Sequence, residues 1–141
     1  MKQMNKQNII EKIRNYLYQK SEIDFAYIFG SFTQKDYYND IDIAVYIKSG
    51  FNYKNFNLYP FGYASLISGE LLKIINYKKV DVVVMNNAGL LILNRIVNKG
   101  LLLFDRDIFR RVYFENRIRK EYIDSENIRK IKDFYMKEKI Q

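Results

Sequence analysis

The chain has 141 residues, of which 48% are hydrophobic, and it carries a formal net charge of +8. This length and hydrophobic share predict a single globular domain with its own core and argue against disorder. Cysteine and histidine are both absent, which excludes thiol catalysis, disulfide bonds, histidine acid–base chemistry and ordinary zinc sites.

The positive charge is concentrated toward the two ends of the chain. Residues 1–21 carry five basic groups and one acidic group, and residues 95–141 carry thirteen and eight, whereas residues 22–94 carry six and seven. Such a distribution would steer an anionic ligand toward the middle segment, although solubility is the simpler explanation of the surplus. The sequence shows no recognised DNA- or RNA-binding module, so direct nucleic-acid binding is not expected.

The polar start of the chain leads into an amphipathic helix. Ile9, Ile13 and Leu17 recur at helical spacing within residues 4–19, which predicts a helix that packs on a sheet. The first residues do not resemble a signal peptide, and no apolar run approaches the length of a membrane span. We therefore expect a cytoplasmic protein.

A glycine–serine turn and a pair of aspartates follow. Residues 25–29 are aromatic and β-branched and predict a strand that ends at Gly30, and residues 41–47 predict a second strand. Asp40 and Asp42 stand at the head of this second strand. Side chains two residues apart on a strand share a face, so the two carboxylates would lie close enough to hold one or two hard cations.

The segments after the second strand complete a small sheet. Residues 48–63 predict a long loop, and loops of this length beside a site often act as lids. Residues 64–76 predict a helix, residues 79–85 a third strand with Asp81 near its start, and residues 101–104 a fourth strand.

The helix before the fourth strand is bounded by two residues. Asn87 is expected to cap its start, and Gly100 is expected to end it in the left-handed conformation. The predicted order of elements, α-β-β-α-β-α-β-α-α, indicates the α/β (α+β) class, with a small mixed sheet and helices packed on it. We expect one domain over residues 1–141, with a core to about residue 105 and a helical tail from about residue 106.

The tail from Asp107 onward is predicted to be helical. Asp124-Ser125 is expected to interrupt it and to cap a last helix, in which Ile128, Ile131 and Tyr135 form one hydrophobic stripe. A stripe of this kind is more often an intramolecular packing face than a docking surface for a partner. We therefore expect it to pack within the chain.

The residue types around the aspartates indicate a site for a metal ion and a triphosphate. Mg²⁺ binds carboxylate oxygens together with phosphate oxygens and water, so Asp40, Asp42 and Asp81 would be enough to hold one or two ions. If a short helix begins after the turn, its N–H groups and the Ser31 hydroxyl would face the phosphates. The alternatives are solvated strand-end carboxylates, an Asp81 salt bridge, and a turn in which Gly30 only ends a strand and Ser31 only caps a helix.

Such a site supports attack of a hydroxyl on a phosphorus atom. Without histidine, the metal–carboxylate route is the one that remains at neutral pH, and Asp81 is the natural acceptor for the proton of the hydroxyl. Lys35 in the loop is expected to be an ordinary surface lysine. Tyr53 and Tyr59 are candidates for contacts with a nucleobase, which the sequence does not decide.

The succession of a Gly-Ser turn, the Asp40 and Asp42 pair and Asp81 resembles the nucleotidyltransferase superfamily that includes DNA polymerase β. Within it, the chain is similar to the minimal nucleotidyltransferase (MNT, MntA-like) antitoxins over nearly its whole length. Later matching elements are Gly100, Arg111, Phe114-Glu115 and Tyr122-Ile123-Asp124. The family commonly has about ten residues between the turn and the acidic pair, often with a second glycine. Here residues 32–39 fill that space without a glycine, so the loop over the phosphates is expected to be tighter.

The resemblance implies an enzyme with a nucleotidyltransferase fold that moves AMP from ATP to a tyrosine hydroxyl and releases pyrophosphate. The acceptor would be a HEPN ribonuclease toxin encoded next to it, and the protein would be its antitoxin. Asp40, Asp42 and Asp81 would be the catalytic and Mg²⁺-binding residues, and Gly30 and Ser31 would bind the nucleotide. The residues by themselves indicate only a nucleoside triphosphate and a hydroxyl.

Two other functions stay open. One is a non-catalytic antitoxin that neutralises the toxin by binding, and the other is a stand-alone nucleotidyltransferase that acts on a small molecule or an RNA end. The shortened loop favours the first of these, whereas the three aspartates argue against it. The chain has no histidine and therefore lacks the R-x-x-x-x-H motif of a HEPN protein, so a partner of that kind would be a separate chain.

Overall fold

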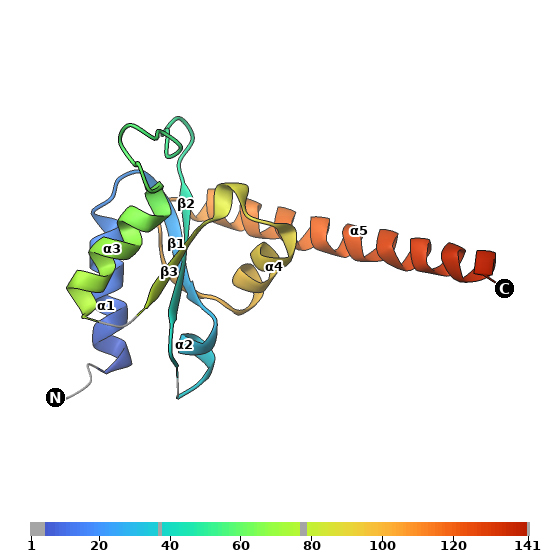
Figure 1. Cartoon of the computed structure of the whole chain (residues 1–141), viewed down its shortest axis with the longest axis horizontal. Helices are drawn as coiled ribbons and strands as arrows, with labels where there is room; N and C mark the ends of the chain where they lie inside the picture. The colour runs from blue at the N-terminus through green and yellow to red at the C-terminus, as the bar shows by residue number, and fades with distance from the viewer. Residues whose placement is uncertain (1–4, 37, 77–78, 141) are drawn as a thin grey trace.

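The computed structural model describes residues 5–36, 38–76 and 79–140, which form one mixed β-sheet with helices on both faces (Figure 1). The strands have the order β3-β2-β1-β4. Their bounds are Ile23–Phe29 for β1, Ile41–Ile47 for β2, Val80–Val84 for β3 and Leu101–Asp105 for β4. The helices are α1 (Lys6–Tyr18), α2 (Ser31–Gln34), α3 (Tyr63–Ile75), the 3₁₀ turn η1 (Met85–Asn87), α4 (Leu90–Lys99) and α5 (Ile108–Ile140). The predicted α/β (α+β) class with a mixed sheet is confirmed.

The strands lie where the apolar runs predict them. β2 has the predicted bounds, and the other three strands differ from the prediction by one or two residues at an end. All residues of β1 are buried, Asp24 included, because the strand is central and covered on both faces, which explains the apolar run over residues 25–29. β1 is antiparallel to β2 and β4, whereas β2 and β3 are parallel. β2 and β3 therefore begin at the edge of the sheet where β1 ends.

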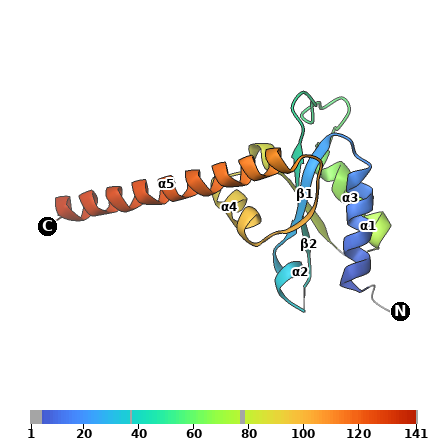
Figure 2. The same ribbon diagram turned by 180° about the vertical axis from the view of Figure 1, so that it is seen from behind.

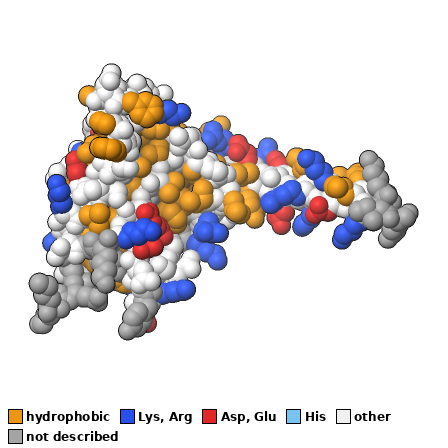
Figure 3. Space-filling model, in the orientation of Figure 1, with side chains coloured by type: hydrophobic (Ala, Val, Ile, Leu, Met, Phe, Trp, Pro, Cys, Tyr) orange, Lys and Arg blue, Asp and Glu red, His pale blue; other side chains and the backbone are white. Residues whose placement is uncertain are grey.

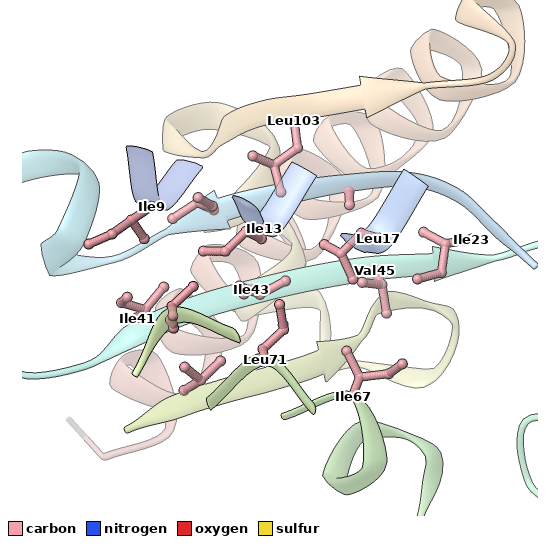
Figure 4. Close-up of a cluster of buried hydrophobic side chains, with 14 of the residues drawn as sticks. Ile9, Ile13, Leu17, Ile23, Ile41, Ile43, Val45, Ile67, Leu71 and Leu103 are labelled. Carbon is pink, nitrogen blue, oxygen red and sulfur yellow. The ribbon is translucent and has the colours of Figure 1, made fainter. Parts of the chain in front are cut away.

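α1 and α3 cover one face of the sheet (Figure 2). Ile9, Ile13 and Leu17 of α1 point into a core that they share with Ile67 and Leu71 of α3 (Figure 4). Full burial of an isoleucine or leucine side chain contributes about 1.5–3 kcal/mol relative to exposure. The helical spacing of these residues therefore decides which side of each helix faces the sheet.

α4 and the first turns of α5 cover the opposite face. Phe25 and Tyr27 of β1 pack there with Phe114 of α5. The Tyr27 hydroxyl donates a hydrogen bond to Glu115 Oε1 at 2.5 Å, and Arg111 Nη1 donates to the same oxygen at 2.8 Å. Burial, and after it the Glu115 carboxylate, raises the pKa of the Tyr27 phenol, so this hydroxyl stays a neutral donor. The network fastens the start of α5 to the sheet.

α4 begins later than the sequence predicts. Asn87 does not cap it but lies in η1, and Gly89 stands at the N-cap position. The reason is Asn86, whose side-chain amide accepts a hydrogen bond from Ile47 N and donates one to Ile47 O, both at 2.8 Å. This pair ties the segment to the end of β2, so the chain completes a 3₁₀ turn before α4 begins.

Gly100 ends α4, but not in the predicted left-handed conformation. Its φ of −71° and ψ of 152° are extended. Glycine fits this position for a different reason, because a Cβ atom here would lie 2.5 Å from Ile96 O and 3.4 Å from Tyr27 Cβ. The close approach of the helix end to the sheet, and not a positive φ, therefore accounts for this glycine.

α5 is one continuous helix that projects from the sheet (Figures 1 and 2). The predicted interruption at Asp124-Ser125 is wrong. Residues 108–140 contain neither glycine nor proline, so nothing in the backbone breaks the helix. Ion pairs spaced four residues apart support it on either side of the expected break, with Arg117 and Glu121 at 3.8 Å and Glu126 and Lys130 at 3.9 Å.

The hydrophobic stripe of the tail is not an intramolecular packing face. Ile128, Ile131 and Tyr135 are 55%, 56% and 60% exposed, and they lie on the part of α5 that extends away from the sheet. Hydrophobic side chains are visible along this part in Figure 3. The prediction that the stripe packs within the chain is therefore wrong. α5, like the other described helices, is not apolar enough over a sufficient length to cross a membrane.

Candidate active site

The three predicted aspartates lie at the edge of the sheet where β2 and β3 begin. Asp42 pairs with Phe29 of β1 on one side and with Asp81 of β3 on the other, and Asp40 precedes β2. The ammonium of Lys79 lies 3.8 Å from Asp40 Oδ2 and 3.6 Å from Asp81 Oδ2. Figure 3 shows acidic and basic side chains together over the region of β3. The fold thus brings together carboxylates that are far apart in the sequence.

Asp42 is the aspartate of this acidic cluster whose pKa is raised by its surroundings. Partial burial raises the pKa of Asp42 above its usual value, the charges of Asp81 and Asp40 raise it further, and Lys79 acts in the opposite direction. An additional positive charge would favour the ionised form. The arrangement is therefore one that a bound cation would stabilise.

Gly30 brings the turn after β1 against Asp42. Its φ of 79° and ψ of −154° are values that residues with a side chain rarely adopt, and a Cβ atom here would lie 2.5 Å from Asp42 Oδ2. α2 begins at Ser31, so the short helix expected after the turn is present. The Gly30 carbonyl accepts hydrogen bonds from Thr33 N at 3.2 Å and Thr33 Oγ1 at 2.9 Å. These bonds stabilise the turn at the start of α2.

A cleft of about 470 Å³ opens on the other side of this turn. The turn and α2 form one wall, and α4 with the middle of α5 forms the other. The lining includes Ser31, Lys35, Asn94, Arg95, Lys99 and Tyr122. Since three of these side chains are basic, the cleft suits an anionic ligand.

The alternation of β2 directs Asp42 to the face of the sheet on which this cleft lies. Ile41, Ile43 and Val45 point into the core under α1 and α3. Ala44 belongs to the opposite cluster, which α4 and α5 cover. Side chains two apart share a face, so Asp42 lies on the side of α4.

α4 and α5 contribute cleft residues that the sequence does not place at the site, although Tyr122 belongs to one of the elements that match the family. Arg95 and Asn94 come from α4 and Tyr122 from α5. The amphipathic pattern of α4 shows that it has a polar face, but nothing in the pattern shows what that face meets. Lys35 is exposed, as expected for a surface lysine, and yet it lines the cleft.

The long loop after β2 does not lie at the site. Residues 48–62 follow the end of β2, whereas Asp42 is near its start, and at about 3.3 Å per residue the two ends are roughly 17 Å apart (Figure 1). Tyr59 packs against Tyr63 of α3, with ring centroids 5.3 Å apart, and Tyr53 packs against the core under α1 and α3. The structure therefore does not support a lid role for this loop, and it places Tyr53 and Tyr59, which the sequence left open as nucleobase contacts, at the other end of β2 from the aspartates.

The donor set of the site fits Mg²⁺ that arrives with a triphosphate. Among the residues that the structure describes, no group of three or more ligating side chains is arranged around one point as a ready metal centre. Mg²⁺, however, usually takes only one or two carboxylates and completes its shell with phosphate oxygens and water. Asp40 and Asp42 supply hard oxygen donors of that kind.

Comparison with known protein families finds a match over most of the chain. The family described as "Polymerase beta, Nucleotidyltransferase" matches residues 11–109, more than half of the chain. The matched segment holds all four strands, the Gly30-Ser31 turn and the three aspartates. A comparison with proteins of curated function finds no match.

Several solved structures have a similar fold. One match is a chain in the structure of a tri-AMPylated Shewanella oneidensis HEPN toxin in complex with an MNT antitoxin, with a TM-score of 0.69, 22% identity, and coverage of 94% of this chain and 99% of that chain. Another is a chain of the toxin–antitoxin MntA-HepT, with a TM-score of 0.67, 21% identity, and coverage of 92% of this chain and 98% of that chain. A third is a chain of a toxin–antitoxin structure with AMP-PNP, with a TM-score of 0.67, 23% identity, and coverage of 94% of this chain and 99% of that chain. At these identities the similarity shows the fold.

Gly30→Ala should weaken the binding of Mg²⁺–AMP-PNP, whereas Gly62→Ala should not. Both glycines have a positive φ and an extended ψ, so alanine costs about 1–3 kcal/mol of backbone strain at either position. Only at Gly30 does the added Cβ meet Asp42, and no described atom lies within 4 Å of a Cβ at Gly62. Calorimetric titration and urea unfolding separate the two effects. Equal nucleotide affinities in the two variants would contradict the role of the turn.

Asp42→Asn should stabilise the metal-free protein at pH 7 and not at pH 3. The folded-state pKa of Asp42 is raised above 3.8, so the folded protein favours the neutral carboxyl. The stability that this preference provides is complete below about pH 3.8 and is lost as the pH rises through the raised pKa and Asp42 ionises. Asparagine cannot ionise, so the variant does not lose this stability. Urea unfolding in EDTA at both pH values measures it, with Asp36→Asn, in the connection before β2, as an exposed control. A variant that is no more stable than wild type at pH 7 would show that burial and the neighbouring aspartates do not raise the pKa of Asp42.

Proposed function

Since the chain belongs to the Polymerase beta nucleotidyltransferase family, we propose that it is an Mg²⁺-dependent adenylyltransferase and the antitoxin of a HEPN ribonuclease toxin. It transfers AMP from ATP to a tyrosine hydroxyl of this toxin in the cytoplasm. The observation that carries the proposal is the position of Asp40, Asp42 and Asp81 at one edge of the sheet, with the Gly30-Ser31 turn against Asp42.

The cleft beside the turn is the proposed nucleotide site. Gly30 and Ser31 line it next to the acidic cluster, and Lys35, Arg95 and Lys99 supply positive charge around it. The phosphates would lie at the turn, between the carboxylates and these basic groups. A similar chain comes from a toxin–antitoxin structure with AMP-PNP, which supports an adenine nucleotide as the donor.

The proposed reaction is attack of the acceptor oxygen on the α-phosphorus. A bond forms between these atoms, the bond from that phosphorus to the oxygen that bridges to the β-phosphate breaks, and pyrophosphate leaves with the bonding electrons. Asp81, which is more exposed than Asp42, takes the proton of the hydroxyl. Asp40 and Asp42 hold Mg²⁺, which when bound stabilises the developing negative charge and favours the deprotonated hydroxyl.

A protein acceptor is supported by the exposed part of α5. Tyr122 lines the cleft from the middle of this helix, and the exposed residues Ile128, Ile131 and Tyr135 begin less than two turns beyond it. A protein bound along this stripe would have its own side chains near the nucleotide. Similar chains come from complexes with a HEPN toxin, one of them tri-AMPylated. Neutralisation of the toxin by binding alone is the second candidate, because the same exposed stripe would serve it.

The Asp40→Ala, Asp42→Ala double variant should abolish transfer of AMP, because the metal loses both of its proposed protein ligands. The substrate is the HEPN protein from the neighbouring reading frame, incubated with Mg²⁺ and ATP. Its intact mass should rise in steps of one AMP on tyrosine with the wild-type protein and with the control Asp36→Ala, which changes an exposed aspartate outside the acidic cluster.

Two results would count against this scheme. Transfer by the double variant at the wild-type rate would show that the aspartates are not the catalytic groups. Full neutralisation of the toxin in cells by a double variant that transfers no AMP would establish binding as the antitoxin activity. Circular dichroism of the variant confirms that it is folded.

Asp81→Asn should reduce transfer by roughly 10²- to 10⁴-fold, the range for loss of a positioned proton acceptor. The affinity for Mg²⁺–ATP should change little, because Asp40 and Asp42 remain. Timed AMP transfer and calorimetric titration on the same preparation give both quantities. Normal transfer, or a loss of transfer that only follows a loss of binding, would mean that Asp81 has a different role.

A further inference from the structure

Lys6, at the start of α1, binds the loop that carries the Gly30-Ser31 turn. Its ammonium donates hydrogen bonds to Phe32 O at 2.7 Å and to Lys35 O at 2.5 Å. It also lies over two aromatic rings, 5.2 Å from the ring centroid of Phe32 and 5.1 Å from that of Tyr38. The two rings pack edge to face with centroids 4.7 Å apart. One side chain of the first helix thus contacts three residues of this loop.

These contacts matter because α2 is too short to hold its own position. It has four residues, and a helix of this length is not stable by itself, since nucleation fixes several dihedral angles for few hydrogen bonds. Carbonyl groups at the end of a helix lack partners within the helix, and a positive charge is favourable there. Lys6 supplies both a donor and a positive charge to the Phe32 and Lys35 carbonyls.

The position of α2 determines where the Gly30-Ser31 turn lies. The Phe32 ring is buried in the core at 1% exposure, which anchors the first turn of α2 from the side of the sheet, and Lys6 holds the other end. Gly30 must stay against the Asp42 carboxylate, where there is no space for a Cβ atom. A shift of α2 would therefore move Ser31 and Lys35 relative to the acidic cluster.

Lys6 lies outside the cleft that these residues line. The lining of the cleft includes Ser31 and Lys35 but not Lys6, which instead borders a separate cavity of about 300 Å³ with Phe32, Thr33 and Lys99. Lys99 lines both cavities, but the hydrogen bonds of Lys6 go to α2 and its C-cap, so these bonds act on the cleft through α2 and the turn.

We propose that Lys6 is a positioning residue that holds the Gly30-Ser31 turn in the geometry needed for a nucleoside triphosphate. The proposal rests on the nucleotide-binding function argued above. The contacts of Lys6 also span the short connection between β1 and β2. Residues 32–39 contain no glycine, and the Lys6 contacts with Phe32 and Tyr38 fix the two ends of that connection to α1.

The test is Lys6→Met, which keeps the length of the side chain and removes its charge and its hydrogen bonds. Lys12→Met on the same helix is the matched control, because Lys12 is exposed. Hydrogen exchange of the backbone amides of residues 31–36 should accelerate in Lys6→Met and not in the control. The affinity for Mg²⁺–AMP-PNP should fall about tenfold, in keeping with loss of a hydrogen-bonded charge. Lys6→Arg should restore most of both.

The outcomes separate this proposal from the function on which it rests. If the wild-type protein does not bind Mg²⁺–AMP-PNP, the proposed function fails, whereas the exchange rates still show whether Lys6 holds the turn. If the wild type binds and Lys6→Met has unchanged exchange and affinity, the positioning role is wrong. Faster exchange with unchanged affinity would also overturn it, because the turn would then bind nucleotide without being held.

Discussion

The register of β2 between its two neighbours is the constraint on which the candidate site depends. β2 is antiparallel to β1 and parallel to β3, so Asp42 stands beside Phe29, the last residue of β1, and beside Asp81. Ile41 and Ile43, which are fully buried on the opposite face, fix this register, since a slip by one residue would turn them toward the cleft. The hydrophobic core thereby determines where the carboxylates lie.

This placement works against the stability of the protein without a ligand. Asp42 is partly buried beside two other aspartates, and its pKa is raised in consequence. Gly30 has a backbone conformation that few residues adopt and approaches the same carboxylate. Unfavourable features of this kind gather at functional sites because the surrounding fold imposes them. Here the fully paired strand and the buried face beneath it provide that support, and a cation with its phosphates would relieve the repulsion.

The strands and the acidic cluster could be predicted from the sequence because both depend on local patterns. An apolar run of strand length has few alternatives once Gly30 marks its end, and Asp40 and Asp42 follow that mark at a spacing that puts them on one face. Asp81 could be placed near the start of a strand because the valines around it predict that strand from the sequence. That the fold brings these residues together follows from the pairing of the strands, while their catalytic roles stay a prediction.

The parts that could not be predicted depend on contacts between distant residues. Asn87 is a residue type that often caps helices, but it does not cap α4. The hydrogen bonds between Asn86 and Ile47 hold the segment after β3 against the end of β2. The cleft is formed where α4 and α5 meet the turn, and neither the spacing nor the composition of those helices shows this. The hydrophobic stripe of the tail has the spacing of a helix face that packs against a core, and this spacing predicts burial. In this chain the stripe lies on the projecting part of α5 and is exposed. Hydrophobic periodicity shows which face of a helix is apolar, and it does not show whether the face is covered by the same chain.

The candidate site also has residues on both sides of the segment that carries the family pattern. The family match covers residues 11–109, whereas Lys6 lies before that segment and Tyr122 after it. Lys6 holds α2 from one side of the sheet, and Tyr122 closes the cleft from the other. The strands and the turn carry the three aspartates, but the strands alone do not enclose a cleft. The first helix and the last therefore both border the candidate site, since one contacts the loop beside the aspartates and the other provides part of the surface opposite it.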